Sequence, residues 1–374
     1  MNEPIRILHW GMTPSIGGME NFVMEIYRHI DRNKIQFDFL ISHNGQIAYE
    51  DEINKLGGKI HRITYNFKEN PYLYTKALDD FFKKHKEIKG IHMHSCFIGY
   101  SKLLKIAKKY NIKIRIYHSH NSDNMYPNNS LLYKILELKN KKDIKKYATN
   151  LFACSQKAGE YMFDKSKFIV IKNAIDLKKF SYDKNIRKKK RLELDIENKL
   201  VIGSVGRLQY QKNPLYIVDI FNELYKKNKN AILIMVGEGD LYTSIVDRIK
   251  KYKLEDCVKL LGHREDINHL MQAFDVFLFP SIFEGLGIVL IEAQASGLPC
   301  LTSNCVPLEA KATDIINFMS LDDCIENWTN RLLALAKLPR TSHVEQLKEN
   351  GYDILDLASS LAEFYIKQLE NRRV

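Results

Sequence analysis

Short apolar runs alternate with amphipathic stretches along nearly the whole chain. In the first half the apolar runs fall at 5–10, 37–42, 59–63, 90–94, 112–117, 150–155 and 168–171. Between them, apolar residues recur at helical spacing, for example at 74–85 and 100–110. The alternation resumes at 200–205, 231–236, 258–261 and 273–281. Strands that alternate with helices are typical of parallel, doubly wound sheets, so the pattern predicts an α/β protein.

The length of the chain bears on its division into domains. A chain of 374 residues can form two domains of ordinary size. The polar stretch at 185–199, with a basic run at 187–191, predicts a connector with a short helix. We expect a first domain at 1–180, a second at 181–352 and a final helix at 353–374. The final helix carries Leu357, Leu361, Phe364 and Tyr365 at helical spacing.

A glycine-containing loop follows the first apolar run. Residues 11–20 include Gly17, Gly18 and Glu20, and an amphipathic stretch continues to about Ile30. A glycine loop that leads into a helix N-terminus allows the backbone to approach an anion closely. The loop lacks the Gly-x-Gly-x-x-Gly fingerprint and the Walker lysine, which disfavours dinucleotide-binding dehydrogenases and P-loop proteins. A plain tight turn remains the alternative.

The stretch FEGLGIVLIEA at 283–293 follows a short apolar run and predicts a strand, a glycine-rich turn and a helix. Glu284 and Glu292 would lie about 10 Å apart if most of the stretch is helical. That spacing is too wide for two carboxyl groups that share a proton, but it suits the two ends of a nucleotide sugar. Glu284 would then contact hydroxyls of the transferred sugar, and Glu292 would contact the ribose.

In that hypothesis the diphosphate lies at the start of the helix, where free N–H groups and the positive end of the dipole face it. Its contacts would come from the backbone of Gly285, Leu286, Gly287 and Ile288. The alternative is that Glu292 is a solvated helix residue and that the glycines only form the turn.

A cationic pair follows the first apolar run of the second half. Arg207 and Lys212 lie five residues apart, after a buried-type strand and before a helix that starts at Pro214. A guanidinium and an ammonium on one strand-end loop can both reach a diphosphate. They would stabilise charge on the departing nucleotide in the role that a metal has elsewhere. Either residue alone is typical of a charged surface.

Histidines collect at two predicted strand ends, His92 with His94 and His118 with His120. A lone histidine is usually structural, but two clusters at strand ends in one sheet favour a functional site. No carboxylate lies near them at a metal-binding spacing, and the six cysteines are scattered without a Cys-x-x-Cys motif. The sequence therefore predicts no metal and mostly reduced, structural thiols.

The formal net charge of +12 is unevenly distributed. Residues 1–180 contain 31 Lys and Arg against 18 Asp and Glu, whereas the remainder contains 26 against 27. Such asymmetry indicates an anionic partner for the first half, either a membrane surface or nucleic acid. Lysine-rich stretches at 83–86, 105–109 and 131–146 favour an anionic leaflet, although each alone is typical of a solvated surface. Aromatic residues do not alternate with these lysines, so we expect no nucleic acid partner.

Composition and hydropathy bear on location. Hydrophobic residues at 45% and charged residues at 27% are typical of soluble globular proteins. No apolar run approaches the ~20 residues that cross a bilayer. The first residues read as a strand and lack the long apolar core of a signal peptide. We expect a cytoplasmic protein that makes peripheral contact with the inner face of the membrane.

The setting FEGLGIVLIEAQASGLP, with seven residues between its two glutamates, resembles the signature of retaining glycosyltransferases of the GT-B fold, family 4. Gly-Gly-Met-Glu at 17–20, Ala-Cys-Ser at 153–155 and Gly-Arg-Leu with Lys-Asn at 206–213 resemble further landmarks of that family. The match extends over nearly the whole chain. The resemblance implies two Rossmann-like domains that face each other across a cleft, with the last helix packed back on the first domain.

The resemblance also implies roles for single residues. Gly18 belongs to the loop whose backbone approaches the donor phosphate, and Gly237 and Arg264 lie near the nucleotide base. A histidine at the end of one strand lies at the donor sugar, and His120 is the closest match. His118 remains an alternative, because the motif does not fix the register.

The expected reaction is transfer of a hexosyl unit from a nucleotide diphosphate sugar, a UDP-sugar in the first instance, with retention at the anomeric carbon. The resemblance implies His120, Glu284, Arg207 and Lys212 as catalytic residues, with no cofactor or metal. The expected acceptor is a hydroxyl of a lipid-linked or oligosaccharide acceptor in bacterial capsular or exopolysaccharide synthesis. A sugar-nucleotide epimerase of GT-B fold and a non-catalytic nucleotide-sugar-binding subunit are the alternatives.

Overall fold

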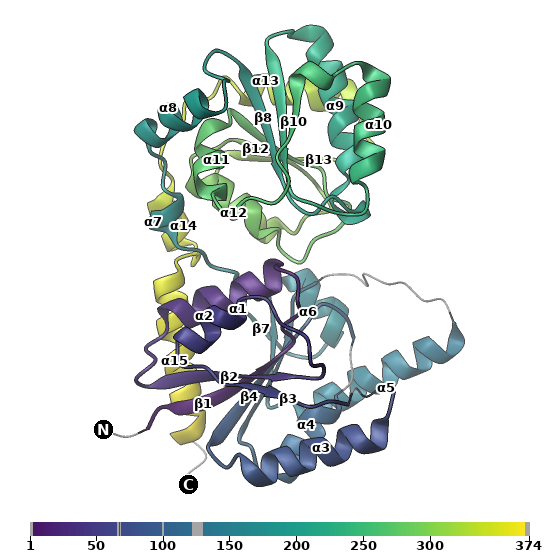
Figure 1. The fold of residues 1–374 in the computed structure, drawn as a ribbon, viewed down its shortest axis with the longest axis vertical. Helices are drawn as coiled ribbons and strands as arrows, with labels where there is room; N and C mark the ends of the chain where they lie inside the picture. Colours follow the sequence, from purple (N-terminus) through teal and green to yellow (C-terminus); the bar gives the residue numbers. More distant parts are fainter. Residues whose placement is uncertain (1–2, 66, 68, 99–100, 122–129, 371–374) are drawn as a thin grey trace. The chain divides into compact units, whose positions relative to one another are not determined.

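The computed structural model describes the chain except for residues 1–2, 66, 68, 99–100, 122–129 and 371–374. The chain forms two compact units (Figure 1). The first comprises the chain up to Ala174 together with the stretch from Ile354 onward. The second is the continuous segment from Ile175 to Asp353. Each unit has its own parallel sheet with helices on both faces, as the alternating pattern predicts.

A parallel sheet of seven strands forms the centre of the first unit, counted over its described residues. In the order in which they pair, the strands are β3 (Ile60–Arg62), β2 (Ile35–Ile41), β1 (Ile5–Trp10), β4 (Ile88–Ser95), β5 (Ile114–Ser119), β6 (Asn150–Ala153) and β7 (Ile169–Val170). The strand order reverses between β1 and β4. Ligands of open α/β sheets bind beside the carboxyl ends of the strands at such a point.

Helices cover both faces of this sheet. They are α1 (Gly18–His29), α2 (Glu50–Lys55), α3 (Pro71–Lys84), α4 (Lys102–Lys109), α5 (Leu131–Tyr147), α6 (Gln156–Phe163) and α15 (Ile354–Glu370). Successive strand residues point to opposite faces, so Ile7 packs in one apolar cluster and Leu8 in another. The first cluster contains side chains of α1, α2 and α15, and the second contains side chains of α3, α4 and α6.

The last helix, α15, packs on the first unit, where Figure 1 draws it in yellow. Leu361 and Tyr365 are buried in the cluster that also contains Phe22 of α1. The apolar residues of α15 at helical spacing therefore face the sheet, and the helix contributes a buried phenol to the core.

A parallel sheet of six strands forms the centre of the second unit, again within the described part of the chain. In pairing order the strands are β10 (Val258–Leu260), β9 (Ala231–Val236), β8 (Leu200–Val205), β11 (Val276–Phe279), β12 (Cys300–Ser303) and β13 (Ile316–Met319). The strand order reverses between β8 and β11, which places the loops after these two strands at the ligand-binding position.

Helices surround this sheet as well. They are α7 (Leu177–Phe180), α8 (Lys184–Glu193), α9 (Pro214–Lys227), α10 (Tyr242–Tyr252), α11 (Ile267–Ala273), α12 (Ile288–Ala295), α13 (Ile325–Leu335) and α14 (Val344–Glu349), with 3-10 turns η1 (Tyr210–Lys212), η2 (Glu255–Cys257) and η3 (Leu308–Ala310). One apolar cluster joins α9, α10 and α13 to the sheet. The other joins α11, α12 and α14 to the opposite face.

The segment near 175–199 differs from its expected form. Leu177 and Phe180 are buried in the core of the second unit, so α7 belongs there, although the expected boundary places residues up to 180 in the first domain. The basic run lies on α8 and is more than a polar connector. Arg187 and Arg191 form ion pairs with Asp275. Charged residues in a polar run can thus hold a helix against the sheet, which composition alone does not reveal.

Candidate functional site

The loop after β8 is held by backbone hydrogen bonds to the next strand end. The Gly206 amide donates to the Val236 carbonyl at 3.0 Å, and the Leu208 amide donates to the Glu238 carbonyl at 2.8 Å. The loop then forms the turn η1, and Pro214 begins α9, as Pro commonly does at a first helical position. These bonds leave the side chain of the intervening Arg207 exposed to solvent.

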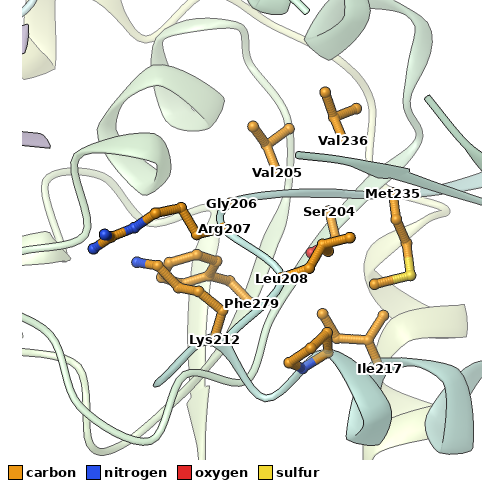
Figure 2. Close-up of a pocket in the computed structure, with 11 residues that line it drawn as sticks. Ser204, Val205, Gly206, Arg207, Leu208, Lys212, Ile217, Met235, Val236 and Phe279 are labelled. Carbon is orange, nitrogen blue, oxygen red and sulfur yellow. The ribbon is translucent and has the colours of Figure 1, made fainter. Parts of the chain in front are cut away.

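Figure 2 shows that the Arg207 and Lys212 side chains extend side by side, in the same direction, past the ring of Phe279. They lie at the mouth of a pocket whose inner wall includes Ser204 and Met235. Within the described residues the Arg207 guanidinium has no ion pair or hydrogen-bond partner, so its five N–H groups are available to a ligand. Arg207 and Lys212, which lie five residues apart in the sequence, therefore point in the same direction in the structure.

Lys212 connects this loop to the loop after β11. Its ammonium forms an ion pair with Glu284, whose carboxylate is buried, and lies 4.8 Å from the centre of the Phe279 ring. The two loops are also joined by the Ile282 amide, which donates to the Gln211 carbonyl at 2.8 Å. An ammonium has three donors, so Lys212 can keep its bond to Glu284 and still donate to a phosphate. Three of the expected site residues therefore lie on two adjoining loops.

The glycine-rich turn and α12 follow as the sequence predicts. Gly285, Leu286 and Gly287 are buried, whereas Ile288, the first residue of α12, is partly exposed. Gly287 has φ +79° and precedes the helix, and this left-handed conformation favours glycine. Glu292 lies in the second turn of the helix and is partly exposed. The amides of the first turn of α12 follow directly on the loop that holds Glu284.

Gly237 and Arg264 lie in the two turns beyond β9 and β10. Gly237 has φ +133°, and a Cβ atom there would lie 2.0 Å from the Gly206 carbonyl oxygen, so the loop after β8 needs this glycine. The Arg264 guanidinium makes two hydrogen bonds of 2.8 Å to Asp266. Lys190 also donates to Asp266, at 2.9 Å. Two cations lower the pKa of the Asp266 carboxyl well below its ordinary range.

The expected residues of the first unit lie at the carboxyl ends of β1 and β5. Gly18 is the first residue of α1, is exposed, and would have open space around a Cβ atom. Glu20 in the first turn is buried and accepts a hydrogen bond of 2.7 Å from the Thr13 hydroxyl. His120 follows β5 directly and is 9% exposed.

His120 is part of a buried group of five histidines on three neighbouring strands. The others are His9 of β1, His92 and His94 of β4, and His118 of β5. Burial lowers the pKa of all five, and that of His120 falls to about 3, so the group is neutral at pH 7. His118 and His120, the two alternatives for the histidine at the donor sugar, therefore lie in the same buried cluster.

Two residues of this region were missed by the sequence reasoning, His9 and Tyr365. His9 lies opposite His92 in the pairing of β1 with β4, and the Tyr365 hydroxyl lies 2.7 Å from His92 Nδ1. The strand order alone would indicate His9, because β1 pairs with β4 at the point where the order reverses, and His9 therefore lies beside the histidines of β4. The helical spacing of α15 indicates that Tyr365 packs on the first unit, but no local pattern links its hydroxyl to His92.

The histidine group also bears on metal binding. Ring nitrogens of His9, His92 and His94 lie within 4.8 Å of one another, and the same is true of His94, His118 and His120. Three imidazoles are a common ligand set for zinc and related ions. The expectation that no metal is needed, made because carboxylates are absent nearby, therefore stays a prediction.

Ser281 is a further polar residue in the second unit that the sequence reasoning did not single out. It follows β11 and Pro280, just before the loop with Glu284. Its side chain is fully buried, and its hydroxyl has no hydrogen-bond partner among the described residues. Its carbonyl accepts a hydrogen bond from the Ser303 hydroxyl, so the backbone position is fixed.

Comparisons with known proteins match both units. The family Glycosyl transferases group 1 matches residues 185–352, and Glycosyltransferase Family 4 matches residues 16–179. The putative glycosyltransferase EpsF of Bacillus subtilis is 31% identical over 377 residues, which cover 96% of each chain. This chain belongs to the family 4 glycosyltransferases. The family resemblance of its motifs is thereby confirmed, and the protein is a transferase.

Other members of the family and one solved structure extend the comparison. The capsular polysaccharide biosynthesis glycosyltransferase CapH of Staphylococcus aureus is 25% identical and covers 97% of this chain and 99% of its own. The Escherichia coli UDP-Gal:alpha-D-GlcNAc-diphosphoundecaprenol alpha-1,3-galactosyltransferase is 30% identical over 57% of each chain. HepE of Anabaena, solved in complex with UDP-glucose, has a TM-score of 0.72 at 18% identity and covers 98% of this chain and 99% of its own. The expected GT-B class, with two Rossmann-like parallel-sheet domains, is confirmed.

Proposed function

We propose that the protein transfers a hexosyl unit from a UDP-sugar to a hydroxyl of a lipid-linked or saccharide acceptor, with retention at the anomeric carbon. The bond between the anomeric carbon and the diphosphate breaks, and the bond to the acceptor oxygen forms on the same face of the sugar. The departing phosphate takes the acceptor proton, so no protein base is required. Capsular or exopolysaccharide synthesis is the proposed setting.

The arrangement of Arg207, Lys212 and Glu284 carries this proposal. Two cationic side chains extend in one direction from the loop after β8, and Glu284 lies on the adjoining loop after β11. Fixed cations of this kind stabilise negative charge as it develops on a leaving diphosphate. The buried carboxylate of Glu284, held by Lys212, accepts hydrogen bonds from sugar hydroxyls in this proposal.

The remaining residues complete the proposed donor site. The turn of Gly285, Leu286, Gly287 and Ile288 leads into α12, whose first amides are suited to a phosphate oxygen. Glu292, one turn further, would bind the ribose hydroxyls. Gly237 and Arg264 would lie near the base, Gly18 near the donor phosphate and His120 at the transferred sugar. These roles are implied by the family and remain predictions.

The relatives support the choice of donor and acceptor. The E. coli relative is named for a UDP-sugar donor and a diphosphoundecaprenol acceptor, and CapH is named for capsular polysaccharide synthesis. HepE has the same fold and was solved with UDP-glucose. A UDP-hexose and a polyprenyl-diphosphate sugar are therefore the first substrates to test.

Incubation of the protein with a panel of UDP-hexoses and synthetic lipid-diphosphate sugars tests the proposal. NMR of the product should show the anomeric configuration of the donor, and activity should persist in EDTA. Arg207→Ala should remove most turnover, whereas Arg331→Ala, which changes an exposed arginine of α13, should not. Inversion of the product contradicts the stereochemistry. Conversion of the donor without an acceptor indicates an epimerase, and donor binding without any product indicates a binding subunit.

Contact with an anionic membrane surface is a second part of the proposal, supported by α5. Leu131, Ile135 and Leu138 are 74%, 54% and 68% exposed, and at 100° per residue they lie within about 60° of one another on the helix. Lys134 and Lys142 are exposed on the same side. An exposed apolar stripe flanked by lysines is typical of helices that lie in the membrane interface. No helix in the described part of the chain has the length and apolar character of a membrane span.

Several lysines of the first unit are already neutralised, one of them on α5 itself. Lys83 pairs with Asp80, Lys109 with Asp79, and Lys141 of α5 with Asp164. The basic excess available to a membrane is therefore smaller than the sequence count indicates, and α5 carries the expected contact.

Sedimentation with vesicles tests this part of the proposal. The protein should bind vesicles that contain phosphatidylglycerol and bind pure phosphatidylcholine weakly. The double change of Ile135 and Leu138 to Ser should abolish binding. Leu192→Ser, at an apolar residue of α8 that is 63% exposed, is the matched control. Equal vesicle binding by the wild type, the double variant and Leu192→Ser would show that α5 does not make the membrane contact.

A further inference from the structure

The five buried histidines form two separate hydrogen-bonded chains of imidazole rings. In one chain His9 Nδ1 lies 3.0 Å from His94 Nε2, and His94 Nδ1 lies 2.9 Å from His120 Nε2. In the other, the Tyr365 hydroxyl lies 2.7 Å from His92 Nδ1, and His92 Nε2 lies 3.1 Å from His118 Nδ1.

The neutral state of these rings fixes how protons are arranged in each chain. A neutral imidazole has one N–H group and one lone pair. A ring that donates to one neighbour must therefore accept from the other, so all hydrogen bonds of a chain point the same way. A chain of neutral rings has one direction or its reverse, and the nitrogen at one end is protonated only if the nitrogen at the other end is not.

The direction of the second chain is set by Tyr365. Burial raises the pKa of its phenol well above the ordinary value, so the hydroxyl keeps its proton. Among the described residues, His92 is the only hydrogen-bond partner of that hydroxyl. The Tyr365 oxygen lies 2.7 Å from His92 Nδ1, a distance typical of an O–H donor and shorter than the roughly 2.9–3.0 Å of an N–H donor, so Tyr365 donates to His92 Nδ1. It follows that His92 donates to His118, and that His118 carries its own proton on Nε2, which is buried and has no hydrogen-bond partner among the described residues.

The first chain has no such end group. His9 Nε2 and His120 Nδ1 are both buried, and neither has a hydrogen-bond partner in the described part of the chain. Both directions of this chain are therefore close in energy. A group that binds at His120 Nδ1 decides whether that nitrogen donates or accepts, and the choice is passed through His94 to His9.

We propose that Tyr365 and His92 are positioning residues that fix the tautomer of His118, while the His9–His94–His120 chain can reverse and lets His120 meet a substrate hydroxyl as donor or acceptor. The part that concerns substrate rests on the proposed function, in which His120 contacts the transferred sugar. A sugar hydroxyl can both donate and accept a hydrogen bond. His120 can therefore change from donor to acceptor as the hydroxyl rotates during transfer, and it remains neutral throughout.

Imidazole ¹⁵N NMR of the full-length protein tests the assignment of protons. His118 should show a protonated Nε2 and an unprotonated Nδ1, whereas His120 should show intermediate shifts for its two nitrogens. In Tyr365→Phe the chain loses its fixed donor, so the His118 signals should move toward intermediate values. Tyr27→Phe is the matched control, because it also removes a buried hydroxyl of the first unit but one bonded to Gln36. Its His118 signals should not change.

Unchanged His118 signals in Tyr365→Phe, or a single fixed tautomer of His120 in the free protein, would overturn the proposal. A zinc ion that copurifies with the histidines and is lost in His94→Leu would do so as well, because coordinated nitrogens cannot form these chains.

Kinetics of two substitutions at His94 test the link to the reaction. Gln has one donor and one acceptor and can keep a connection to His120, whereas Leu has neither. His94→Leu should lower kcat at least tenfold with little change in the KM for the donor, and His94→Gln should recover part of the loss. Equal rates for the two variants and the wild type would remove the chain from catalysis. Absence of turnover in the wild type would refute the proposed function instead, since the NMR result does not depend on it.

Discussion

The carboxyl ends of the two sheets, although equivalent in topology, have opposite chemistry. In the first unit the strand ends carry five buried imidazoles that burial keeps neutral and that bond mainly to one another. In the second unit the corresponding loops carry Arg207 and Lys212, which are partly open to solvent, and one buried carboxylate. Neutral groups suit hydroxyls, and charged groups suit a diphosphate. One fold can thus provide two kinds of recognition at the same topological position.

The largest expected effect comes from loss of Lys212. Lys212→Met removes a cation from the proposed diphosphate site and from the buried carboxylate of Glu284. We expect kcat/KM to fall by about 10²–10³-fold. We also expect the second unit to lose about 2 kcal/mol of unfolding free energy, because a buried charge loses its counterion.

The double variant Lys212→Met with Glu284→Gln separates the two effects. It should recover stability without recovering activity. Denaturant titration and steady-state kinetics with a UDP-sugar measure both quantities. Recovery of activity in the double variant would contradict the role of Lys212 at the diphosphate.

The second expected effect is a loss of stability between pH 7.5 and pH 5 that is larger in the first unit than in the second. His120 has a pKa of about 3 in the folded protein and about 6.5 when unfolded, so the unfolded chain binds more protons between these values. Stability is therefore complete above pH 6.5 and falls as pH drops toward 3. The loss from His120 alone between pH 7.5 and pH 5 is about 2 kcal/mol, and the pKa of each other histidine in the group is shifted in the same direction.

Each unit contains one of the two tryptophans, Trp10 in β1 and Trp328 in α13, so fluorescence can follow the units separately. Trp328→Phe leaves a reporter in the first unit, and Trp10→Phe leaves one in the second. Urea titrations from pH 7.5 to pH 5 should show the loss with the Trp10 reporter. Equal slopes in both variants would show that the histidine group does not dominate the acid response.

The fold and the loops of the second unit that carry the candidate site could be predicted from the sequence. The contacts between the side chains of those loops could not. The alternation of strands and helices predicted both sheets, and the spacing of the motifs predicted Arg207, Lys212 and Glu284 as site residues. The ion pair between Lys212 and Glu284 could not be predicted, because it joins residues 72 positions apart on loops that follow different strands. The partnership of Tyr365 with His92, across 273 positions, has no local signal at all.

Gly237→Ala is expected to reduce the stability of the second unit alone. A methyl group at φ +133° would also lie 2.0 Å from the Gly206 carbonyl oxygen, so the loop that carries Arg207 must move. We expect a loss of about 2–4 kcal/mol, measured by thermal unfolding of the Trp328 reporter. Gly18→Ala is the control in the first unit, since a Cβ atom there would meet nothing within 4 Å. A larger loss of stability for Gly18→Ala than for Gly237→Ala would contradict the inference that glycine is required at 237 and not at 18.

The smallest expected effect is that of Ser281→Ala. The hydroxyl is buried without a partner among the described residues, so its removal should change stability by less than about 1 kcal/mol and can raise it. If the hydroxyl contacts the donor, the KM for the UDP-sugar should rise while the melting temperature stays the same. Calorimetric unfolding and donor titration distinguish these results. A marked loss of stability would mean that the hydroxyl is bonded in the folded protein.

The position of α15 has a consequence for how the molecule is made. The second unit is one uninterrupted segment from Ile175 to Asp353, whereas the first needs residues from both sides of it. During synthesis on the ribosome, the earlier-translated unit must wait with part of its apolar face uncovered until Tyr365 and its neighbours emerge. The unit translated second can therefore finish folding first, and a fragment that stops before α15 should depend on chaperones to remain in solution.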